Sequence, residues 1–300
     1  MENKGRVLTI GTFDGVHIGH QQILKRLTTI AKQKDLLSTV LTFFPHPRMV
    51  LQKEASIKLI NTIEEKAVLM ENFGIEHLMV KEFTKVFSRL TALEFVRDIL
   101  VNELNTKHII VGYDHRFGRN RTANIEDLKS FGELYDFTVE EISAQDINDV
   151  TVSSTKIRSA LSQGDIKIVN SFLGYNFQLS GTVVSGKSIG KTLGYPTANI
   201  KIAEPYKSIP KQGVYVVKSN YKDAIVYGMM NIGMNPTVAG ENETIEVHFF
   251  NFDENLYEQK LNIEVLHSLR DEKKFESIEA LKQQLTKDAK QSKTYIKSHA

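Results

Sequence analysis

The feature that most constrains the fold is a change in the pattern of apolar residues partway along the chain. Up to about residue 174, short apolar strand patterns alternate with amphipathic helix patterns. After residue 175, strand patterns dominate until a closing helix over 277–296. Alternation predicts a doubly wound, mostly parallel sheet, whereas a run of strands predicts an antiparallel barrel or sandwich. We therefore predict an α/β domain over 1–174 and a β domain over 175–300.

The patterns predict specific elements in each part. The strands expected in the first part are 6–10, 38–43, 77–80, 108–111 and 138–142, and its helices are 19–32, 62–73, 92–100, 125–134, 153–164 and 165–173. The strands expected in the second part are 178–184, 214–217, 224–230, 244–250 and 261–266.

Composition limits the partners and the compartment. The 38 Lys and Arg residues nearly balance 36 Asp and Glu residues, which argues against a nucleic-acid partner. The absence of cysteine excludes disulfides, thiolate zinc sites and cysteine nucleophiles, and fits a reducing compartment. No apolar run approaches the roughly 20 residues that span a bilayer, and the first residues lack a signal-peptide pattern. We predict a cytoplasmic protein with no membrane partner.

The tetrapeptide His17-Ile18-Gly19-His20 lies where the first strand leads into the first helix. Ligands of open parallel sheets bind at the carboxyl ends of strands, and a helix N-terminus offers free N–H groups to phosphate. A turn on the surface is the alternative, but two histidines in this spacing favour a phosphate site. The residues predicted to bind the phosphates here are Gly11, Phe13, Gly15, His17, Gly19 and His20.

Three further polar loops follow strands of the same predicted sheet. His46 follows the second strand, between two prolines that stiffen its loop. Asp114 and Arg116 follow the fourth strand and could hold a ribose, a flavin or a phosphate. A helix begins after the fifth strand, with Ser154 as its expected N-cap and Arg158 one turn in. Each loop alone is explained by local structure, but four at one sheet edge predict a site.

The second part contains the glycine-rich stretch GKSIGKTLGYPTAN, residues 186–199. It does not fit a P-loop, because Ser185 stands where the first glycine is required. Glycines and lysines in a loop nevertheless bind phosphates, and hydroxyl and amide oxygens suit Mg²⁺. A flexible hairpin is the alternative. The predicted phosphate-binding residues are Gly186, Lys187, Gly190 and Lys191, and the predicted metal ligands are Thr197 and Asn199.

The segment TIEVHFF, residues 244–250, alternates strictly between apolar and other residues. Alternation places Glu246 and His248 on one face of a strand and the apolar side chains on the other. A carboxylate on a rigid strand is a candidate general base, although a solvated strand face is the alternative.

These motifs together resemble the prokaryotic bifunctional riboflavin kinase/FMN adenylyltransferase (FAD synthetase) family. GTFDGVHIGHQ, FFPHP, GYDHRFG and SSTKIR are similar to its HxGH nucleotidyltransferase module, which transfers AMP from ATP to FMN and gives FAD and pyrophosphate. The resemblance implies that His17 and His20 bind phosphates, that Ser154, Thr155 and Arg158 form the SSTxIR motif, and that Arg158 contacts phosphate. It implies flavin-side roles for His46, Asp114 and Arg116.

GKSIGKTLGYPTAN, GVYVV, NIGMNPT, EVHFF and LRDEKKF resemble the riboflavin kinase module of the same family. The resemblance implies a small six-stranded barrel that passes the γ-phosphate of ATP to the riboflavin 5′-hydroxyl. Thr197 and Asn199 would position Mg²⁺, Glu246 would accept the hydroxyl proton, and Asn231 and Arg270 would lie on the flavin side. The implied molecules are Mg²⁺, ATP as co-substrate, riboflavin as substrate, and FMN and FAD as products. We expect a monomer or weak homo-oligomer.

The chain departs from the family pattern at three positions. His115 stands where the family has an aromatic residue, Ala123 replaces the last glycine of a GxxRxG run, and Thr12 stands where many relatives have Asn. Three alternatives remain. A class I aminoacyl-tRNA synthetase shares the HIGH signature but needs a module for tRNA. The others are a flavin enzyme with one decayed site and a flavin-binding protein without turnover.

Overall fold

The computed structural model describes residues 4–52, 57–143, 152–186, 189–222, 224–237 and 240–299. The chain forms two compact units: Met1–Ile57 with Ile63–Ser153, and Lys58–Thr62 with Ser154–Ala300. The helices that follow Ser153 therefore group with the second unit, and so does a short segment from early in the chain. The domain boundary after residue 174 stays a prediction.

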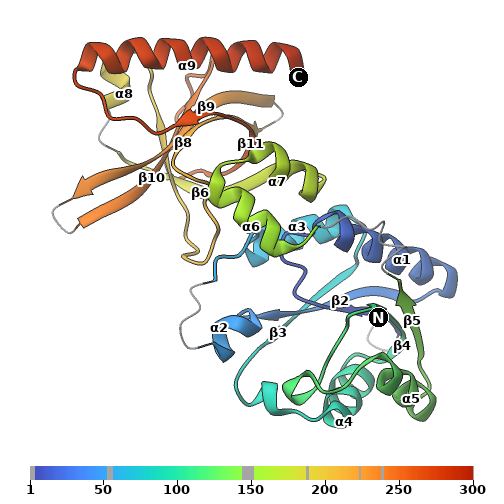
Figure 1. The fold of residues 1–300 in the computed structure, drawn as a ribbon. Coiled ribbons are helices and arrows are strands. Elements are labelled where there is room, and N and C mark those ends of the chain that lie inside the picture. Colours follow the sequence, from blue (N-terminus) through green and yellow to red (C-terminus); the bar gives the residue numbers. More distant parts are fainter. Residues whose placement is uncertain are drawn as a thin grey trace. The chain divides into compact units, whose positions relative to one another are not determined.

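The first unit contains a parallel five-stranded sheet in the order β3-β2-β1-β4-β5, which confirms the predicted doubly wound fold (Figure 1). The strands are β1 (Arg6–Ile10), β2 (Leu37–Phe44), β3 (His77–Glu82), β4 (Thr106–Gly112) and β5 (Thr138–Ile142). The chain moves outward from β1 through β2 to β3 and then returns to place β4 on the other side of β1. The carboxyl ends of β1 and β4 therefore flank a topological switch point, where ligands bind in such sheets.

Helices and short turns connect these strands. They are α1 (Ile18–Lys34), α2 (Pro47–Leu51), α3 (Ile63–Asn72), the 3₁₀ turn η1 (Phe87–Arg89), α4 (Ala92–Glu94), which continues as the π-helix η2 (Phe95–Glu103), the 3₁₀ turn η3 (Arg119–Arg121), and α5 (Ile125–Tyr135). The sequence indicated a loop where α2 forms. Its first residue is Pro47, and proline is favoured there because the first helical N–H has no partner within the helix.

The second unit is built on a closed antiparallel barrel in the order β10-β7-β6-β11-β8-β9 (Figure 1). The strands are β6 (Phe177–Val184), β7 (Ala198–Lys201), β8 (Gly213–Tyr221), β9 (Ala224–Thr237), β10 (Gly240–Phe249) and β11 (Lys260–Asp271). The barrel predicted by resemblance is confirmed, and the sandwich that the strand pattern left open is not formed. The strand pattern missed β7, because four residues next to a proline and several glycines give too short an apolar signal.

In the described part of the chain, the second unit also contains the helices α6 (Ser154–Gln163), α7 (Ile166–Leu173), α8 (Ile189–Thr192) and α9 (Ile278–His299). Helix α7 packs against β6 and β11, and α9 packs across β8, β9 and β11. Helix α6 begins at Ser154, so the expectation that Ser154 is its N-cap is wrong, and Ser153 is the residue that precedes the helix. None of the described helices is both long and apolar enough to cross a membrane.

Candidate active sites

The loop between β1 and α1 has a strained backbone. Phe13, Gly15 and Val16 have positive φ angles of 44°, 86° and 36°. Glycine adopts such angles readily, but phenylalanine and valine need support from their surroundings. The Val16 N–H donates to the Phe13 carbonyl at 3.2 Å, and Gln21 Nε2 donates to the Val16 carbonyl at 2.9 Å. Strain that is held in place in this way is typical of ligand-binding loops.

The two histidines of this loop lie against each other. His17 is the N-cap of α1, and its Nδ1 accepts a bond from the His20 backbone N–H at 3.4 Å. Because Nδ1 accepts, the neutral ring carries its proton on Nε2. The two rings stack with their centroids 3.6 Å apart, and His20 Nδ1 is buried with no hydrogen-bond partner among the described residues.

Both histidines are uncharged at neutral pH. Burial lowers the pKa of His17 to about 4. Burial lowers the pKa of His20 well below its usual value, and electrostatic interactions with His17 and Lys66 lower it further. The pair therefore offers neutral N–H donors at the start of α1, where backbone N–H groups also favour an anion.

Lys66 on α3 is a residue that the motifs did not indicate. Its side chain is buried, and its Nζ donates to the Thr12 carbonyl at 2.7 Å. Burial lowers the pKa of Lys66 to about 8, against the opposing effect of the Asp14 carboxylate. In the sequence, Lys66 follows two glutamates in an amphipathic helix, which is also the pattern of an exposed charged face.

The loops after β2 and β4 carry the other residues predicted in the first unit. His46 is the N-cap of α2, and its Nδ1 accepts from the Arg48 backbone N–H at 3.1 Å. Asp114 and Arg116 are exposed in the turn after β4. Because β2, β1 and β4 are neighbours in a parallel sheet, these loops and the histidine loop share its carboxyl edge, as predicted.

The replaced glycine at position 123 does not prevent the loop after β4 from closing. Phe117 and Ala123 exchange two backbone hydrogen bonds, of 3.1 and 3.2 Å. Positive φ angles occur at Gly118, Asn120 and Arg121 but not at Ala123, so position 123 does not require glycine. Gly118 is required, because a Cβ there would lie 3.0 Å from the Ala92 backbone nitrogen.

The SSTKIR motif forms the start of α6. Arg158 Nη2 donates to Thr155 Oγ1 at 3.4 Å within the first turns of the helix. Ser154, Thr155 and Arg158 belong to the second compact unit, whereas His17 and His20 belong to the first. That these two groups bind the same phosphates stays a prediction.

In the barrel, strand register brings three of the predicted residues side by side. Glu246 on β10 is the direct cross-strand partner of Asn199 on β7 and of Asn231 on β9. Direct partners in an antiparallel pair point to the same face. Ile245, Val247 and Phe249 are buried, which bears out the predicted alternation. The candidate base thus stands between two amides on one face of three adjacent strands.

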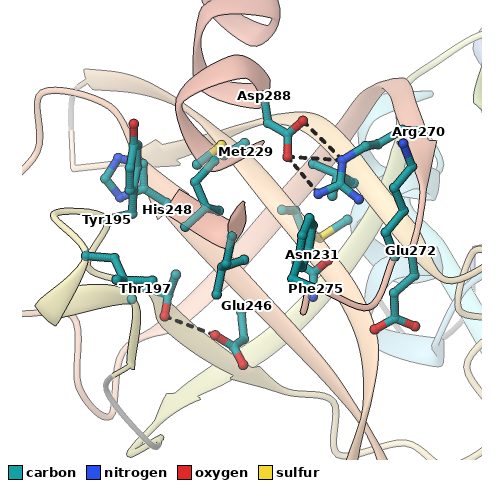
Figure 2. Close-up of a pocket in the computed structure, with 17 residues that line it drawn as sticks. Tyr195, Thr197, Met229, Asn231, Glu246, His248, Arg270, Glu272, Phe275 and Asp288 are labelled. Atoms are coloured by element: carbon teal, nitrogen blue, oxygen red, sulfur yellow. Dashed lines mark hydrogen bonds and ion pairs between the residues drawn. The ribbon is translucent and has the colours of Figure 1, made fainter. Parts of the chain in front are cut away.

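Glu246 opens onto a cavity of about 250 Å³ (Figure 2). Thr197 Oγ1 donates to Glu246 Oε2 at 3.1 Å, so the hydroxyl of the predicted metal ligand contacts the candidate base. His248 Nδ1 donates to the Pro196 carbonyl at 2.8 Å, and burial lowers the pKa of His248. The cavity is lined by residues of the glycine-rich stretch, of four strands, of the segment between β11 and α9, and of α9 itself: Gly190, Leu193, Tyr195, Thr197, Val214, Met229, Met230, Asn231, Glu246, His248, Arg270, Glu272, Lys273, Phe275, Leu281, Leu285 and Asp288.

Two glycines of the stretch are required by close packing. A Cβ on Gly186 would lie 2.0 Å from Asn199 Nδ2, and one on Gly190 would lie 2.3 Å from the Tyr195 carbonyl oxygen. Gly186 therefore lets the backbone approach Asn199, and Gly190 lets it approach Tyr195, which argues against a merely flexible hairpin. Lys187 lies outside the described residues, and the side chain of Lys191 is not described either.

Helix α9 contributes a residue that the sequence analysis missed. Asp288 is fully buried, and its carboxylate accepts from Arg270 Nη2 at 2.7 Å and from Arg270 Nε at 3.1 Å (Figure 2). Gln284 Nε2 donates to the same carboxylate at 2.7 Å. Arg270 was predicted on the flavin side, and the structure places it in the cavity wall with its guanidinium held by α9. Asp288 gave no signal because it lies in a mostly polar helix, where a single carboxylate is expected to face solvent.

The chemistry of the donors fits Mg²⁺ at Thr197 and Asn199. Their hydroxyl and amide oxygens lie beside a carboxylate, and Mg²⁺ prefers oxygen ligands. Among the described residues, no group of three or more His, Asp or Glu side chains could hold a metal. In nucleotide sites Mg²⁺ usually takes part of its coordination from substrate phosphates.

The two units match two family models. Residues 1–156 match the FAD synthetase model, and residues 173–296 match the riboflavin kinase model. The chain is 39% identical to a bifunctional riboflavin kinase/FMN adenylyltransferase from Buchnera aphidicola, over 98% of this chain and 95% of the relative. It is 35% identical to the protein of that name from Haemophilus influenzae, over 98% and 96% of the two chains.

A solved structure has the same fold over almost the whole chain. A crystal structure of a protein called macrolide-efflux protein, from Streptococcus pneumoniae, superposes with a TM-score of 0.87 at 31% identity, over 97% of this chain and 94% of that chain. Fold and sites thus define a protein with an HxGH nucleotidyltransferase unit and a kinase barrel. The chain belongs to the bifunctional riboflavin kinase/FMN adenylyltransferase family, which confirms the predicted resemblance.

Proposed function

We propose that this protein makes FAD in two steps. The barrel phosphorylates riboflavin with ATP to give FMN. The first unit, which contains the parallel sheet and is called the sheet domain below, adenylylates FMN with a second ATP to give FAD and pyrophosphate. Family membership over nearly the full chain supports both activities. One observation carries the kinase assignment: Glu246 lines a cavity and accepts a hydrogen bond there from Thr197.

In the kinase step, Glu246 accepts the proton of the riboflavin 5′-hydroxyl. The freed oxygen forms a bond to the γ-phosphorus of ATP, and the bond from that phosphorus to the β,γ-bridging oxygen breaks, which releases ADP. The strand holds Glu246 in place between two amides, so the base needs no reorganisation. Asn231 and Arg270, in the same cavity wall, are suited to orient the flavin.

In the adenylylation step, an oxygen of the FMN phosphate bonds to the α-phosphorus of ATP. The bond to the α,β-bridging oxygen breaks, and pyrophosphate leaves. This nucleophile is already an anion, so alignment and stabilisation of charge matter more than a base. Neutral His17 and His20 donate N–H groups to phosphate oxygens, and Arg158 adds a cation if α6 carries it to the phosphates. His46, Asp114 and Arg116 serve the flavin side.

Mg²⁺ fits this scheme as the cofactor. Thr197 and Asn199 would hold it in the barrel, where it neutralises charge on the phosphates that are being transferred. Gly186 and Gly190 bring the backbone close to those phosphates. We further propose that the protein works in the cytoplasm, without a nucleic-acid partner, as a monomer or weak homo-oligomer.

Chromatography of the products tests the function. The full-length protein is incubated with ATP and Mg²⁺, once with riboflavin and once with FMN. We expect FMN followed by FAD in the first reaction and FAD in the second. FMN from riboflavin with no product from FMN would reduce the function to a single kinase activity. Tight flavin binding without consumption of ATP would indicate a binding protein.

A further inference from the structure

A buried lysine lies beside the loop that carries the histidine pair. We propose that Lys66 is a positioning residue for adenylyl transfer, which holds the β1–α1 loop through the Thr12 carbonyl and offsets the charge of Asp14 beside the ATP phosphates. The proposal rests on the adenylyltransferase function proposed above. It concerns a residue outside the loop motifs, in the middle of α3.

One atom of the β1–α1 loop, the Thr12 carbonyl oxygen, is hydrogen-bonded to both α3 and β2. The Thr12 carbonyl accepts from Lys66 Nζ at 2.7 Å and from Thr42 Oγ1 of β2 at 3.2 Å. The Thr12–Phe13 peptide bond is trans, so the Phe13 N–H points opposite to that carbonyl. Fixing the carbonyl therefore fixes the direction of an N–H in the loop, and it supports the positive φ of Phe13 that follows.

The charge of Lys66 has a separate role. His17 and His20 are neutral, so they bring no cation to a triphosphate. The Asp14 side chain is buried in the same loop, and a carboxylate there repels phosphate unless an opposite charge is near. Lys66 interacts electrostatically with Asp14 and supplies that charge. A charged donor also makes a stronger bond to the carbonyl than a neutral one.

The first test is the variant Lys66→Met in the full-length protein. Methionine keeps the length of the side chain and removes both the charge and the donor. We expect kcat/KM for adenylylation of FMN to fall about 100-fold, the size of losing one preorganised electrostatic group. Riboflavin phosphorylation by the same sample stays within threefold of the parent, which shows that the barrel is folded. Thermal unfolding reports on the sheet domain.

The pH profile separates this role from simple packing. The charged and titratable groups around Lys66 are Asp14 in the loop, His20 on α1 and its buried neighbour Glu65 on α3. Lys66 changes charge near pH 8 because its pKa is about 8, whereas burial keeps the pKa of His20 well below its usual value. Adenylylation by the parent should therefore decline as pH rises through about 8, and this decline should be absent from Lys66→Met.

Two further variants serve as control and as independent test. Lys207 is a second buried lysine, whose Nζ donates to the Ile60 carbonyl at 2.6 Å in the other unit, so Lys207→Met is a matched control. It should leave adenylylation within threefold of the parent. Thr42→Val removes the second bond to the Thr12 carbonyl without changing the side-chain shape. It should lower adenylylation about fivefold, in line with one neutral hydrogen bond.

The outcomes are distinct. Failure of the parent to make FAD from FMN contradicts the proposed function and not the role of Lys66. Loss of adenylylation in Lys66→Met, together with loss of the alkaline decline, supports the proposal. Adenylylation within threefold of the parent overturns it, and so does an unchanged pH profile. If Lys66→Met does not fold, Thr42→Val decides: full activity in that variant overturns the anchoring of the loop through Thr12.

Discussion

The two sites of this chain are built in opposite ways. In the first unit the site lies on loops and a helix start, with strained residues at Phe13 and Val16, and with neutral His17 capping α1 beside neutral His20. In the barrel, Glu246 sits on a strand between Asn199 and Asn231, and register alone aligns the three. A site that binds phosphate only through N–H donors can be built on loops, provided that other elements anchor those loops. A proton acceptor must be placed more accurately, and a rigid strand provides that placement.

The largest expected difference between the two sites comes from a substitution of Glu246. Glu246→Gln removes the proton acceptor but keeps its shape and the partner of Thr197. We expect FMN formation to fall by about 1,000-fold, within the usual range for general bases, while FAD formation from supplied FMN persists. Both rates are measured by chromatography on one preparation. Kinase turnover at the parental rate would remove Glu246 from this role.

The loop site should give the reverse pattern in His20→Ala. The change removes a phosphate donor and the ring that stacks on His17. Adenylylation should fall about 100-fold, as for one preorganised donor, with riboflavin phosphorylation unchanged. The same assay pair measures it. Loss of both activities would show that the two units are coupled or that the variant is misfolded, and thermal unfolding separates these two results.

The wall of the barrel cavity should respond to Asp288→Asn. This change leaves the Arg270 guanidinium without its buried counter-charge, so its orientation in the cavity loosens. We expect KM for riboflavin to rise about tenfold, equivalent to roughly 1.4 kcal/mol, with adenylylation unchanged. Thr294→Ala, an exposed position on the same helix, is the control. An unchanged KM would mean that Arg270 does not orient the flavin.

The smallest expected effect is on stability in mild acid. Burial lowers the pKa of His17 to about 4, whereas an unfolded histidine titrates near 6.5. Below pH 6.5 the unfolded chain binds the extra proton, so the folded state loses stability as pH falls. Between pH 7 and 5.5 this amounts to roughly 1 kcal/mol, or a few degrees in Tm.

Comparison with His17→Asn isolates this contribution. The Tm of the variant should change less with pH than that of the parent, because the group that titrates only in the unfolded state is gone. Equal changes in Tm for both proteins would show that His17 is not kept neutral by burial.

What could be predicted from the sequence follows the same division. His17, His20, Thr197 and Glu246 stand in contiguous motifs or in a strict alternation, so local pattern was enough to predict them as site residues. The closure of the barrel was harder, because β7 has only four residues and its pairing is set by partners far along the chain. The alternation of apolar residues locates a strand, but it does not show which residues of two strands lie opposite each other.

Lys66 and Asp288 could not be found from pattern for a related reason. Each lies on a helix whose sequence reads as a charged, exposed face, and each is buried because another element covers it. A buried charge is costly unless it has a partner, but the partners, Thr12 and Arg270, lie on other elements of the fold, 54 and 18 residues away along the chain. Only the tertiary structure brings these pairs together.

The most direct test of two separate working sites is a mixing experiment. Glu246→Gln and His20→Ala are each supplied with riboflavin, ATP and Mg²⁺, alone and as an equimolar mixture, and the flavin products are separated by chromatography. We predict unreacted riboflavin from the first variant, FMN from the second, and FAD from the mixture, because FMN released by one chain is used by the other. A mixture that makes no FAD would contradict two independent sites in this chain.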